Sequence, residues 1–244
     1  MDFIYGIHVV EEALKTRPRS VSHLAVARER SDIKLQRIID AARSAGIPLR
    51  FEPRAALDRL AHSGAHQGVV AAVTAKTYLG LDDLLQQRRG KFAFVVVLDG
   101  VEDPHNLGAV IRTAEAAGAD GIVIPERRAA GVTATAAKAS AGAAERLPVA
   151  RVTNIARTVE QLKEQNIWTV GLDERGSQSY EQLDYRMDCA LVLGAEGHGL
   201  HDLVRRKCDF LVSIPMLGSV PSLNVSVAAG VVMYEIVRQR RSKE

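Results

Sequence analysis

Polar side chains capable of chemistry follow three apolar runs in the C-terminal part of this 244-residue chain. The runs FVVVLD, LVLG and FLVSIP are short and rich in aliphatic residues, which is typical of buried strands. Ligands bind beyond the carboxyl ends of the strands in a parallel sheet, so the residues just after these runs are candidates for a site. They are Asn106 and Arg112 after the first run, Gly194 and Glu196 at the end of the second, and Ser222 and Asn224 after the third.

The first candidate loop, LDGVEDPHNLGAVIRTAEAAG, leads into a predicted helix that begins at Leu107. Asn106 stands at the expected N-cap, where its side chain can accept a hydrogen bond from a free backbone N–H group. Arg112 lies about two turns into the helix, and its permanently charged guanidinium can bind a phosphate or stabilise a developing oxyanion. For this loop alone, a plain helix cap and a solvated arginine are the alternative interpretation.

The second candidate loop, LVLGAEGHGL, is rich in glycine and carries one carboxylate, that of Glu196. Glycine at the end of a strand, here Gly194, lets a ligand approach the backbone closely. The spacing differs from the G-x-G-x-x-G pattern of dinucleotide-binding enzymes, and the chain has no P-loop sequence, so both of these classes are disfavoured. A tight turn with one exposed glutamate is the alternative interpretation.

The third candidate loop, IPMLGSVPSLNVSVAAG, places turn formers and small polar residues between an apolar run and a long apolar helix. Ser222 and Asn224 straddle the predicted start of that helix. Their side chains can cap its free N–H groups or face a ligand. The pattern predicts a ligand-binding loop at the exit of a strand.

Histidines offer little support for a metal centre. His62 and His66 are four residues apart, as helical metal ligands are, but no third ligand lies nearby in the sequence. His198 and His201 are equally weak evidence for a metal site. No Ser–His–Asp or catalytic cysteine pattern is present either. We therefore predict no metal and no covalent nucleophile.

The two cysteines and the absence of a long apolar run bear on location. Cys189 and Cys208 stand in apolar, strand-like contexts and are predicted to be buried free thiols, which indicates a reducing cytoplasm. No apolar run approaches the ~20 residues that a membrane span requires. The opening residues MDFIYGIHVVEEAL do not have the pattern of a signal peptide. We expect a cytoplasmic protein without a membrane segment.

Alternating strands and helices predict an α/β fold in two domains: a small α/β module at residues 1–76, a polar linker at 77–90, and a mostly parallel sheet covered on both faces at 91–244. In the module, the predicted helices are 7–14, 33–45 and 54–61, and the predicted strands are 23–27, 47–51 and 69–73. In the larger domain, the predicted strands are 92–98, 121–124, 167–171, 190–193 and 210–214, and the predicted helices are 107–117, 155–164 and 223–240.

Positive charge is concentrated in the first module. Residues 1–76 contain 12 Lys and Arg against 8 Asp and Glu, whereas residues 77–244 contain 20 against 21. A module that binds a polyanion such as RNA is one interpretation of this excess, and a solvated surface is the other.

Together the three loops resemble the SpoU (TrmH-like) family of RNA ribose 2'-O-methyltransferases in the SPOUT superfamily. The signature is ordered: N-x-G-x-x-x-R-T-A, then G-x-E-G after a strand, then I-P-M-x-G-x-x-x-S-L-N-x-S after another strand. These stand here at 106–114, 194–197 and 214–226. The stretches GIHVVEEAL and HQGVVAAV look like the family's ribosomal-protein-L30e-like substrate-binding domain. The most similar subgroup is the bacterial 23S rRNA guanosine-2'-O-methyltransferases.

The resemblance implies a fold and a cofactor that the residue pattern alone does not predict. It implies a deep trefoil knot in the C-terminal domain, a homodimer, RNA as the substrate, and S-adenosyl-L-methionine as the methyl donor. It places cofactor contacts at Gly194, Ile214 and Leu223, largely through the backbone. The catalytic set that it implies is Arg112, Asn106, Glu196, Ser222 and Asn224.

Among these residues, the resemblance nominates Arg112 as the group that activates the ribose hydroxyl. Free guanidinium is rarely a base, so orientation of a neighbouring phosphate and stabilisation of the alkoxide form an alternative role. Glu196 would pair with Arg112 or bind ribose hydroxyls. A tRNA methyltransferase, an antibiotic-resistance rRNA methyltransferase and a catalytically silent RNA-binding protein are the alternative functions.

Overall fold

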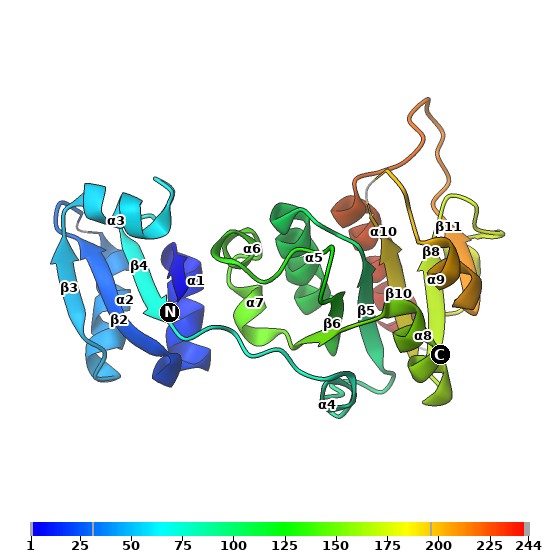
Figure 1. Ribbon diagram of the computed structural model, residues 1–244, viewed down its shortest axis with the longest axis horizontal. Coiled ribbons are helices and arrows are strands. Elements are labelled where there is room, and N and C mark those ends of the chain that lie inside the picture. Colours follow the sequence, from blue (N-terminus) through cyan, green and yellow to red (C-terminus); the bar gives the residue numbers. More distant parts are fainter. Residues whose placement is uncertain (1, 31, 196, 242–244) are drawn as a thin grey trace. The chain divides into compact units, whose positions relative to one another are not determined.

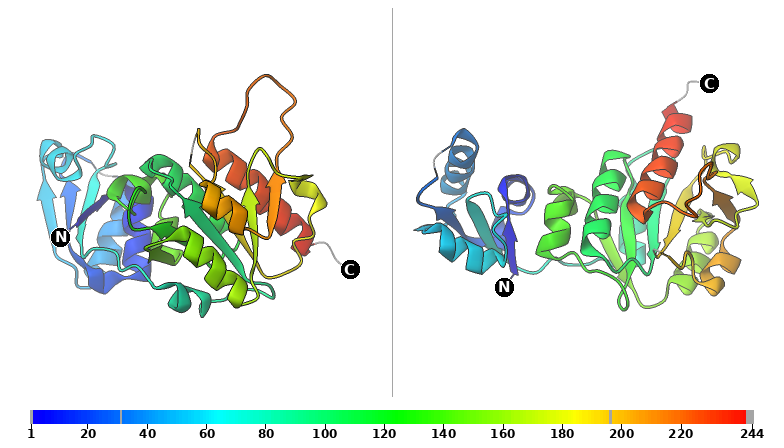
Figure 2. Two further views of the ribbon diagram at one scale, coloured as in Figure 1. Left: turned by 45° about the vertical axis from the view of Figure 1, so that its right-hand side comes forward. Right: turned by 90° about the horizontal axis from the view of Figure 1, so that it is seen from above.

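The computed structural model describes residues 2–30, 32–195 and 197–241 and divides them into two compact units. The first comprises residues up to Thr77 together with Val132–Arg146, and the second comprises Tyr78–Gly131 together with Leu147 onward. Figure 1 shows the elements of each unit, and Figure 2 shows them from two further directions. Every element of the three candidate loops belongs to the second unit.

The first unit is built on a four-stranded mixed sheet in the order β1-β4-β2-β3. β4 pairs antiparallel with β1 and β2, and β2 pairs parallel with β3. The strands are β1 (Asp2–Tyr5), β2 (Val21–Ala27), β3 (Leu49–Glu52) and β4 (Val69–Val73), and the helices are α1 (Ile7–Thr16), η1 (Pro18–Ser20), α2 (Ile33–Ser44) and α3 (Arg54–Ala61). All six elements predicted for this module are present, whereas β1 and η1 were not predicted. Apolar side chains at helical spacing on α1 and α2, such as Val10 and Ile38, are buried against the sheet.

Two short helices, α6 (Ala134–Ala139) and α7 (Ala143–Arg146), are separated from the rest of the first unit by more than fifty residues of sequence. Ala137 lies in the same buried cluster as the core of α1 and α2. Arg17 donates two hydrogen bonds to the carboxylate of Glu145, whose side chain is only 2% exposed, and Arg146 pairs with Glu12 at 2.9 Å. Residues 132–146 are rich in alanine, but nothing in their sequence indicates that they associate with the first unit.

Lys76 joins the same cluster and gives it a pH dependence. Its ammonium donates to the carbonyl of Ala144. Burial lowers the pKa of Lys76 to about 8, an effect that the charge of Glu145 opposes and that of Arg17 reinforces. Between about pH 8 and pH 10 the unfolded chain then binds more protons than the folded chain, so this residue makes stability rise with pH across that window.

We therefore expect Lys76→Met, which keeps the apolar stem, to flatten the rise of the unfolding temperature between about pH 8 and pH 10. Thermal unfolding of wild type and variant at several pH values measures the difference. Lys34→Met, at an exposed lysine of the same unit, is the matched control and should leave the slope unchanged. Equal slopes in wild type and Lys76→Met would contradict a buried ammonium at this position.

The second unit contains a seven-stranded sheet in the order β7-β6-β5-β10-β8-β11-β9, and all its strand pairs are parallel. The strands are β5 (Phe94–Asp99), β6 (Gly121–Pro125), β7 (Val149–Val152), β8 (Trp168–Leu172), β9 (Gln178–Ser179), β10 (Cys189–Gly194) and β11 (Phe210–Ser213). The central strands β5 and β10 are buried along their whole length, as continuous apolar runs require. The predicted parallel α/β domain is confirmed.

Helices cover both faces of this sheet, as Figure 1 and Figure 2 show. α10 packs on α5, and α8 packs on α9. The helices are α4 (Leu81–Leu85), α5 (Pro104–Ala116), α8 (Ile155–Glu164), η2 (Tyr180–Gln182), α9 (Asp202–Lys207) and α10 (Val225–Arg241). Neither unit has a helix, among the described residues, that could cross a membrane.

Several predicted boundaries differ from the structure by one or two residues, and the start of α5 differs by three. α5 begins at Pro104, three residues before the expected start, and the N-cap is Asp103, whose carboxylate accepts a hydrogen bond from the N–H of His105 at 2.9 Å. An aspartate followed by proline at the first helical position is a stronger start signal than the asparagine further along. Asn106 therefore lies inside the first turn, with its side chain free for another role.

Candidate active site

A cavity of about 600 Å³ lies at the carboxyl ends of β8, β10 and β11. Its walls come from the loop after β8, the glycine loop after β10, and the segment between β11 and α10. Four of the eight predicted site residues line it: Gly194, Ile214, Ser222 and Leu223. The remaining lining is mixed. Apolar side chains come from Leu172, Leu193, Pro215, Met216, Pro221, Val225 and Ala228, and polar or charged side chains come from Asp173, Glu174, Arg175, His198 and Ser213. A cavity of this size and mixed lining suits a small organic ligand.

Gly194 ends β10 where two backbone segments touch. A Cβ atom at this position would lie 2.0 Å from the carbonyl carbon of Gly199, which no side chain permits. The contact exists because Ala195 and Gly199 exchange two backbone hydrogen bonds of 3.0 and 3.1 Å, closing the loop into a tight ring. Gly197 and Gly199 have positive φ angles inside that ring. The glycine pattern thus shapes the cavity wall.

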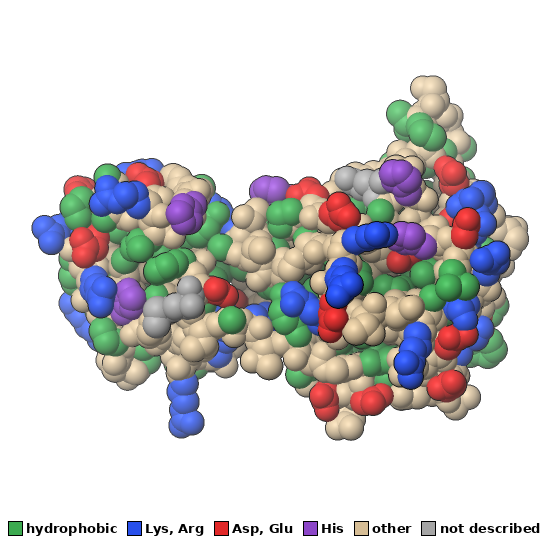
Figure 3. Space-filling model, in the orientation of Figure 1, with side chains coloured by type: hydrophobic (Ala, Val, Ile, Leu, Met, Phe, Trp, Pro, Cys, Tyr) green, Lys and Arg blue, Asp and Glu red, His purple; other side chains and the backbone are tan. Residues whose placement is uncertain are grey.

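The segment from Ile214 to Leu223 offers backbone groups to the cavity. Met216 and Leu223 both line it, and their backbone N–H and C=O groups make no hydrogen bond to another described residue. Polar backbone groups usually find a partner, so these are available to a ligand. The outer part of this loop projects from the unit and carries hydrophobic side chains at its tip (Figure 3), where Leu217 is 99% exposed and Val220 is 57% exposed.

Sequence reasoning missed Asp173, a buried carboxylate in the cavity wall. It follows β8, and its two oxygens accept hydrogen bonds from the guanidinium of Arg175 at 2.8 and 3.1 Å. Burial alone would raise the pKa of Asp173, but the hydrogen bonds and charge of Arg175 outweigh it and lower the pKa below the ordinary value. The ionised carboxylate is thus a fixed acceptor for ligand hydroxyl or amino groups. A carboxylate directly after an apolar strand was the available signal.

Asp99 at the end of β5 was not predicted as a site residue, but it anchors the glycine loop. It is 5% exposed and accepts a hydrogen bond from the backbone N–H of His201 at 2.8 Å. The imidazole Nδ1 of His201 lies 3.0 Å from the same carboxylate oxygen. One buried carboxylate therefore fixes the loop that follows β10 to the neighbouring strand.

Asn106 and Asn224, from segments 118 residues apart, meet side chain to side chain. The amide nitrogen of Asn224 donates to the Oδ1 atom of Asn106 at 3.0 Å. The Oδ1 atom of Asn224 caps α10 by accepting from the N–H of Ser226 at 2.9 Å. Asn106 is 9% exposed, so its amide is held in place beneath the surface. The pair ties the start of α10 to the first turn of α5.

We expect Asn224→Ala to lower the free energy of unfolding by about 1–2 kcal/mol, because α10 loses its cap and Asn106 loses its donor. Asn224→Asp keeps the capping oxygens and should retain most of this stability. Urea unfolding of wild type, Asn224→Ala, Asn106→Ala and the double variant Asn106→Ala/Asn224→Ala measures the coupling in a double-mutant cycle, and unfolding of Asn224→Asp checks the cap. Stability equal to wild type in Asn224→Ala would contradict the capping role.

Arg112 is exposed on α5 and does not line the cavity. Within the described part of the chain, its guanidinium has neither an ion pair nor a hydrogen bond, so it is available to an incoming group. Glu196, its predicted partner, lies outside the described residues. The structure thus places four predicted residues at the cavity and two in the asparagine pair, and Arg112 stands apart from both.

The histidines and cysteines do not form a second reactive centre. The ring of His66 is buried, accepts the N–H of Gly68 and bonds to the carboxylate of Asp58 at 3.0 Å, which is a structural role. Across the described residues there is no cluster of potential metal ligands. Both cysteines are free, and burial raises their pKa values to about 11 at Cys189 and about 12 at Cys208, so neither is a thiolate at neutral pH.

These features define an α/β enzyme that holds a small ligand at the carboxyl edge of its sheet and carries a separate small unit. Comparison with family models narrows the class. Residues 93–234 match the SpoU rRNA Methylase family, and residues 3–79 match the model for RNA 2'-O ribose methyltransferase substrate binding. The chain belongs to the SpoU rRNA methylase family.

Relatives of similar length support this membership. A Shewanella oneidensis protein, the 23S rRNA (guanosine-2'-O-)-methyltransferase RlmB, is 46% identical over 99% of this chain and 98% of its own. A Bacillus subtilis (strain 168) protein, YacO, named provisionally as a TrmH family tRNA/rRNA methyltransferase, is 48% identical over 98% of this chain and 96% of its own. The crystal structure of the SpoU methyltransferase AviRb from Streptomyces viridochromogenes, in complex with AdoMet, matches with a TM-score of 0.82 at 28% identity, covering 98% of this chain and 90% of that one.

Proposed function

We propose that this protein transfers a methyl group from S-adenosylmethionine to the ribose 2'-hydroxyl of a guanosine in 23S rRNA, in the cytoplasm. The observation that supports the proposal is the cavity at the carboxyl edge, which Gly194, Ile214 and Leu223 line. The full-length likeness to RlmB, whose name specifies guanosine methylation in 23S rRNA, supports this choice of substrate.

The residues of the cavity fit S-adenosylmethionine. The volume of about 600 Å³ and the apolar side chains suit an adenine ring, and the free backbone groups of Met216 and Leu223 can pair with its polar atoms. The ionised carboxylate of Asp173 suits hydroxyl groups or a cationic amine. When bound, this group supplies an electrophilic methyl carbon on a sulfonium.

The chain's own residues would then position the ribose and stabilise charge. Arg112, which is exposed and unpaired among the described residues, would hold the phosphate beside the target ribose and stabilise the alkoxide that forms as the hydroxyl loses its proton. Asn106 and Asn224 would fix the start of α5 and α10 around it. Ser222 would contact the ligand from the cavity wall. Glu196 would pair with Arg112 or bind ribose hydroxyls, a role that only the sequence motif supports.

We propose residues 1–76 as the RNA-binding module, 77–90 as the linker and 91–244 as the catalytic domain. The positive charge excess of residues 1–76 and the substrate-binding model at residues 3–79 support the first assignment. Residues 78–90 are a well-structured connection, since α4 and a backbone bridge between Leu79 and Ala150 hold them on the second unit.

We further propose that the protein is a homodimer through the second unit. The supporting observation is apolar surface: Val227 and Tyr234 lie two turns apart on one face of α10, and each is 51% exposed. Val220, nearby in the chain, is 57% exposed. Light scattering on the purified chain should give twice the monomer mass, and Tyr234→Glu should lower it. A monomer at micromolar concentration would contradict the dimer.

The trefoil knot belongs to the proposal as well. It is supported by the likeness to the AviRb crystal structure over 98% of the chain and by the strand order, in which β10 lies between β5 and β8 and the chain returns from β11 to α10 beside α5. An experimental electron-density map that traces the segment from Ile214 to Val225 outside the loop after β10 would contradict it.

The decisive experiment is transfer of tritiated methyl groups from S-adenosylmethionine to unmodified 23S rRNA, with unmodified tRNA assayed in parallel, followed by mapping of the modified ribose. We expect incorporation at one guanosine of 23S rRNA. Incorporation into tRNA instead would favour the tRNA activity included in the name of YacO. Incorporation into neither RNA would contradict the proposal.

A further inference from the structure

A second cavity of about 790 Å³ lies at the opposite edge of the same sheet, where β5 begins and α10 ends. It is lined by the end of the linker, the start of β5, the turn after α5 and the last turns of α10. The lining residues are Gly90, Lys91, Phe92, Phe94, Ala117, Gly118, Arg186, Ile236, Val237, Arg240 and Arg241. Four of these are cationic, and none is acidic.

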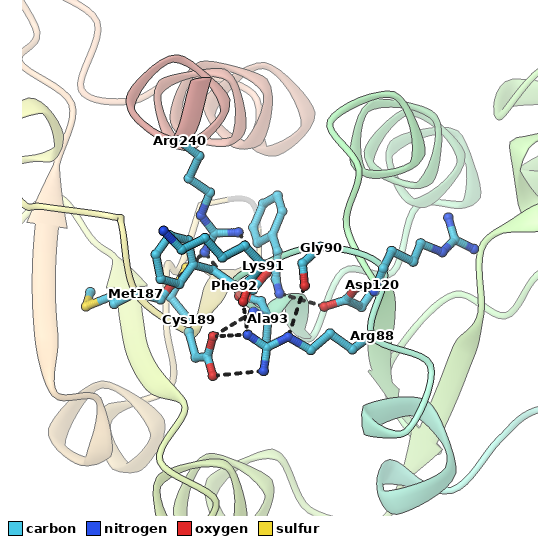
Figure 4. A network of polar contacts seen from close by, with 12 residues as sticks. Arg88, Gly90, Lys91, Phe92, Ala93, Asp120, Met187, Cys189 and Arg240 are labelled. Carbon is cyan, nitrogen blue, oxygen red and sulfur yellow. Dashed lines mark hydrogen bonds and ion pairs between the residues drawn. The ribbon is translucent and has the colours of Figure 1, made fainter. Parts of the chain in front are cut away.

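Two carboxylates clamp the linker where it forms the wall of this cavity, as Figure 4 shows. Asp188 accepts the N–H of Ala93 at 2.8 Å and pairs with the guanidinium of Arg88 at 2.9 Å. Asp120, which is 3% exposed, accepts the N–H groups of Arg89 and Phe94 at 2.6 and 2.7 Å. The backbone that presents Lys91 and Phe92 is thus fixed in advance, which reduces the entropy lost when a ligand binds.

Arg240 places a positive charge in the wall of the cavity. Its guanidinium donates to four backbone carbonyls, including those of Ala93 at 3.0 Å and Met187 at 2.7 Å, and to the sulfur of Cys189 (Figure 4). Burial raises the pKa of Cys189 to about 11 despite the opposing charge of Arg240, so that thiol is neutral. No described carboxylate pairs with Arg240, and its charge favours an anion in the cavity.

The mouth of the cavity combines exposed cations with an aromatic ring. Lys91 and Arg241 are exposed, and Arg186 forms an ion pair with Asp184 in which both side chains are more than half exposed, so this pair is easily replaced by a phosphate. The ring of Phe92 is half-buried, with the ammonium of Lys91 5.2 Å and the guanidinium of Arg240 5.6 Å from its centre. Ile236 and Val237 continue the apolar floor.

We propose that this cavity binds one nucleotide of the substrate RNA, remote from the nucleotide that is methylated. Its base would lie against Phe92 and the apolar floor, and its phosphate would be held by Lys91 and Arg241 at the mouth. Cations that track a backbone beside an aromatic ring are the combination that binds single-stranded RNA without sequence preference. The site is a second hold on the RNA, at the edge of the sheet opposite the methyl-transfer cavity.

This inference rests on the proposed function, because it takes RNA as the substrate. The test uses the full-length protein in three forms: wild type, the double variant Lys91→Gln/Arg241→Gln, and Phe92→Leu. Binding of an unmodified 23S rRNA fragment is measured over a series of salt concentrations, and S-adenosylmethionine binding is measured by calorimetry. We expect the double variant to bind the RNA about tenfold more weakly and to lose about 1.4 from the slope of log affinity against log salt, since each phosphate contact on a single strand contributes about 0.7.

Phe92→Leu should weaken RNA binding about tenfold with little change in the salt slope, because stacking involves no counterion release. Both variants should bind S-adenosylmethionine normally and, at saturating RNA, transfer methyl groups at the wild-type rate with a raised KM. Arg157→Gln removes an exposed cation of the same unit on α8, outside both cavities, and should leave affinity and slope unchanged.

Unchanged RNA affinity and salt slope in the double variant would overturn the inference. A second result would also overturn it: guanosine monophosphate or inorganic phosphate binds wild type but not the double variant, while both forms bind the RNA equally well. The cavity would then bind a free anion rather than the RNA. If Phe92→Leu fails to fold, the double variant still tests the inference, because Lys91 and Arg241 are exposed and their replacement should not disturb the fold. Absence of methyl transfer to any RNA by wild type would instead contradict the proposed function, independently of this site.

Discussion

Arg112→Ala should reduce methyl transfer at least a hundredfold while leaving the unfolding temperature and the affinity for S-adenosylmethionine close to wild type. The guanidinium is exposed, has no partner among the described residues and lies outside the cavity, so its removal breaks no contact of the fold or of the cofactor wall. Loss of one donor to a developing oxyanion typically costs a factor of about 10² to 10³. Single-turnover assays with saturating RNA and cofactor measure the loss.

Two further variants sharpen the role of Arg112. Arg112→Lys keeps the charge but loses the planar pair of donors, so partial activity would indicate charge stabilisation and full loss would indicate bidentate phosphate binding. Arg157→Ala, an exposed arginine on α8, is the control for loss of one surface charge. Turnover within a fewfold of wild type in Arg112→Ala would remove this residue from the mechanism.

Gly194→Ala should abolish binding of S-adenosylmethionine. A Cβ atom at this position would lie 2.0 to 2.3 Å from backbone atoms of Gly199 and Leu200, and backbone cannot rotate away as a flexible side chain can. The hydrogen bonds between Ala195 and Gly199 must then break, and the wall that Gly194 and Gly199 share moves. We expect no measurable cofactor affinity by calorimetry and an unfolding temperature lowered by several degrees, as overpacking usually costs about 1–3 kcal/mol.

The control for Gly194→Ala is Gly218→Ala, in the projecting loop. Gly218 does not line the cavity, its φ angle is not positive, and a Cβ atom there would meet nothing within 4 Å. This variant should bind the cofactor as wild type does. Normal affinity in Gly194→Ala would show that the ring of residues 195–199 is not part of the cofactor wall.

Strand exits in the second unit could be predicted because their signals are local. Buried parallel strands such as β5 and β10 are continuous apolar runs, and the polar residues after them fall at one edge of the sheet. The start of α5 was misplaced because Asn106 resembled a cap, whereas Asp103 followed by proline is the cap. The bond from Asn224 to Asn106 joins residues 118 positions apart, and no local pattern indicates it.

The contacts that individual side chains make across the sheet could not be predicted from the sequence. Asp173 and Asp99 are ordinary acidic residues in the sequence, and only the parallel register of β8, β10 and β5 brings them to the glycine loop. The clamp of Asp120 and Asp188 on the linker depends in the same way on turns at the other edge. These contacts depend on the order of the strands in the sheet, which a local stretch of sequence does not indicate.

The attachment of residues 132–146 to the first unit has a consequence for biosynthesis. The carboxylate of Glu145, which Arg17 binds, lies 128 positions further along the chain. On the ribosome, the first 77 residues therefore emerge well before the helices that cover part of their core, including Ala137. Nascent chains halted before residue 132 should expose apolar surface and be good clients for chaperones, and chains extended past residue 146 should lose that property as the unit becomes complete.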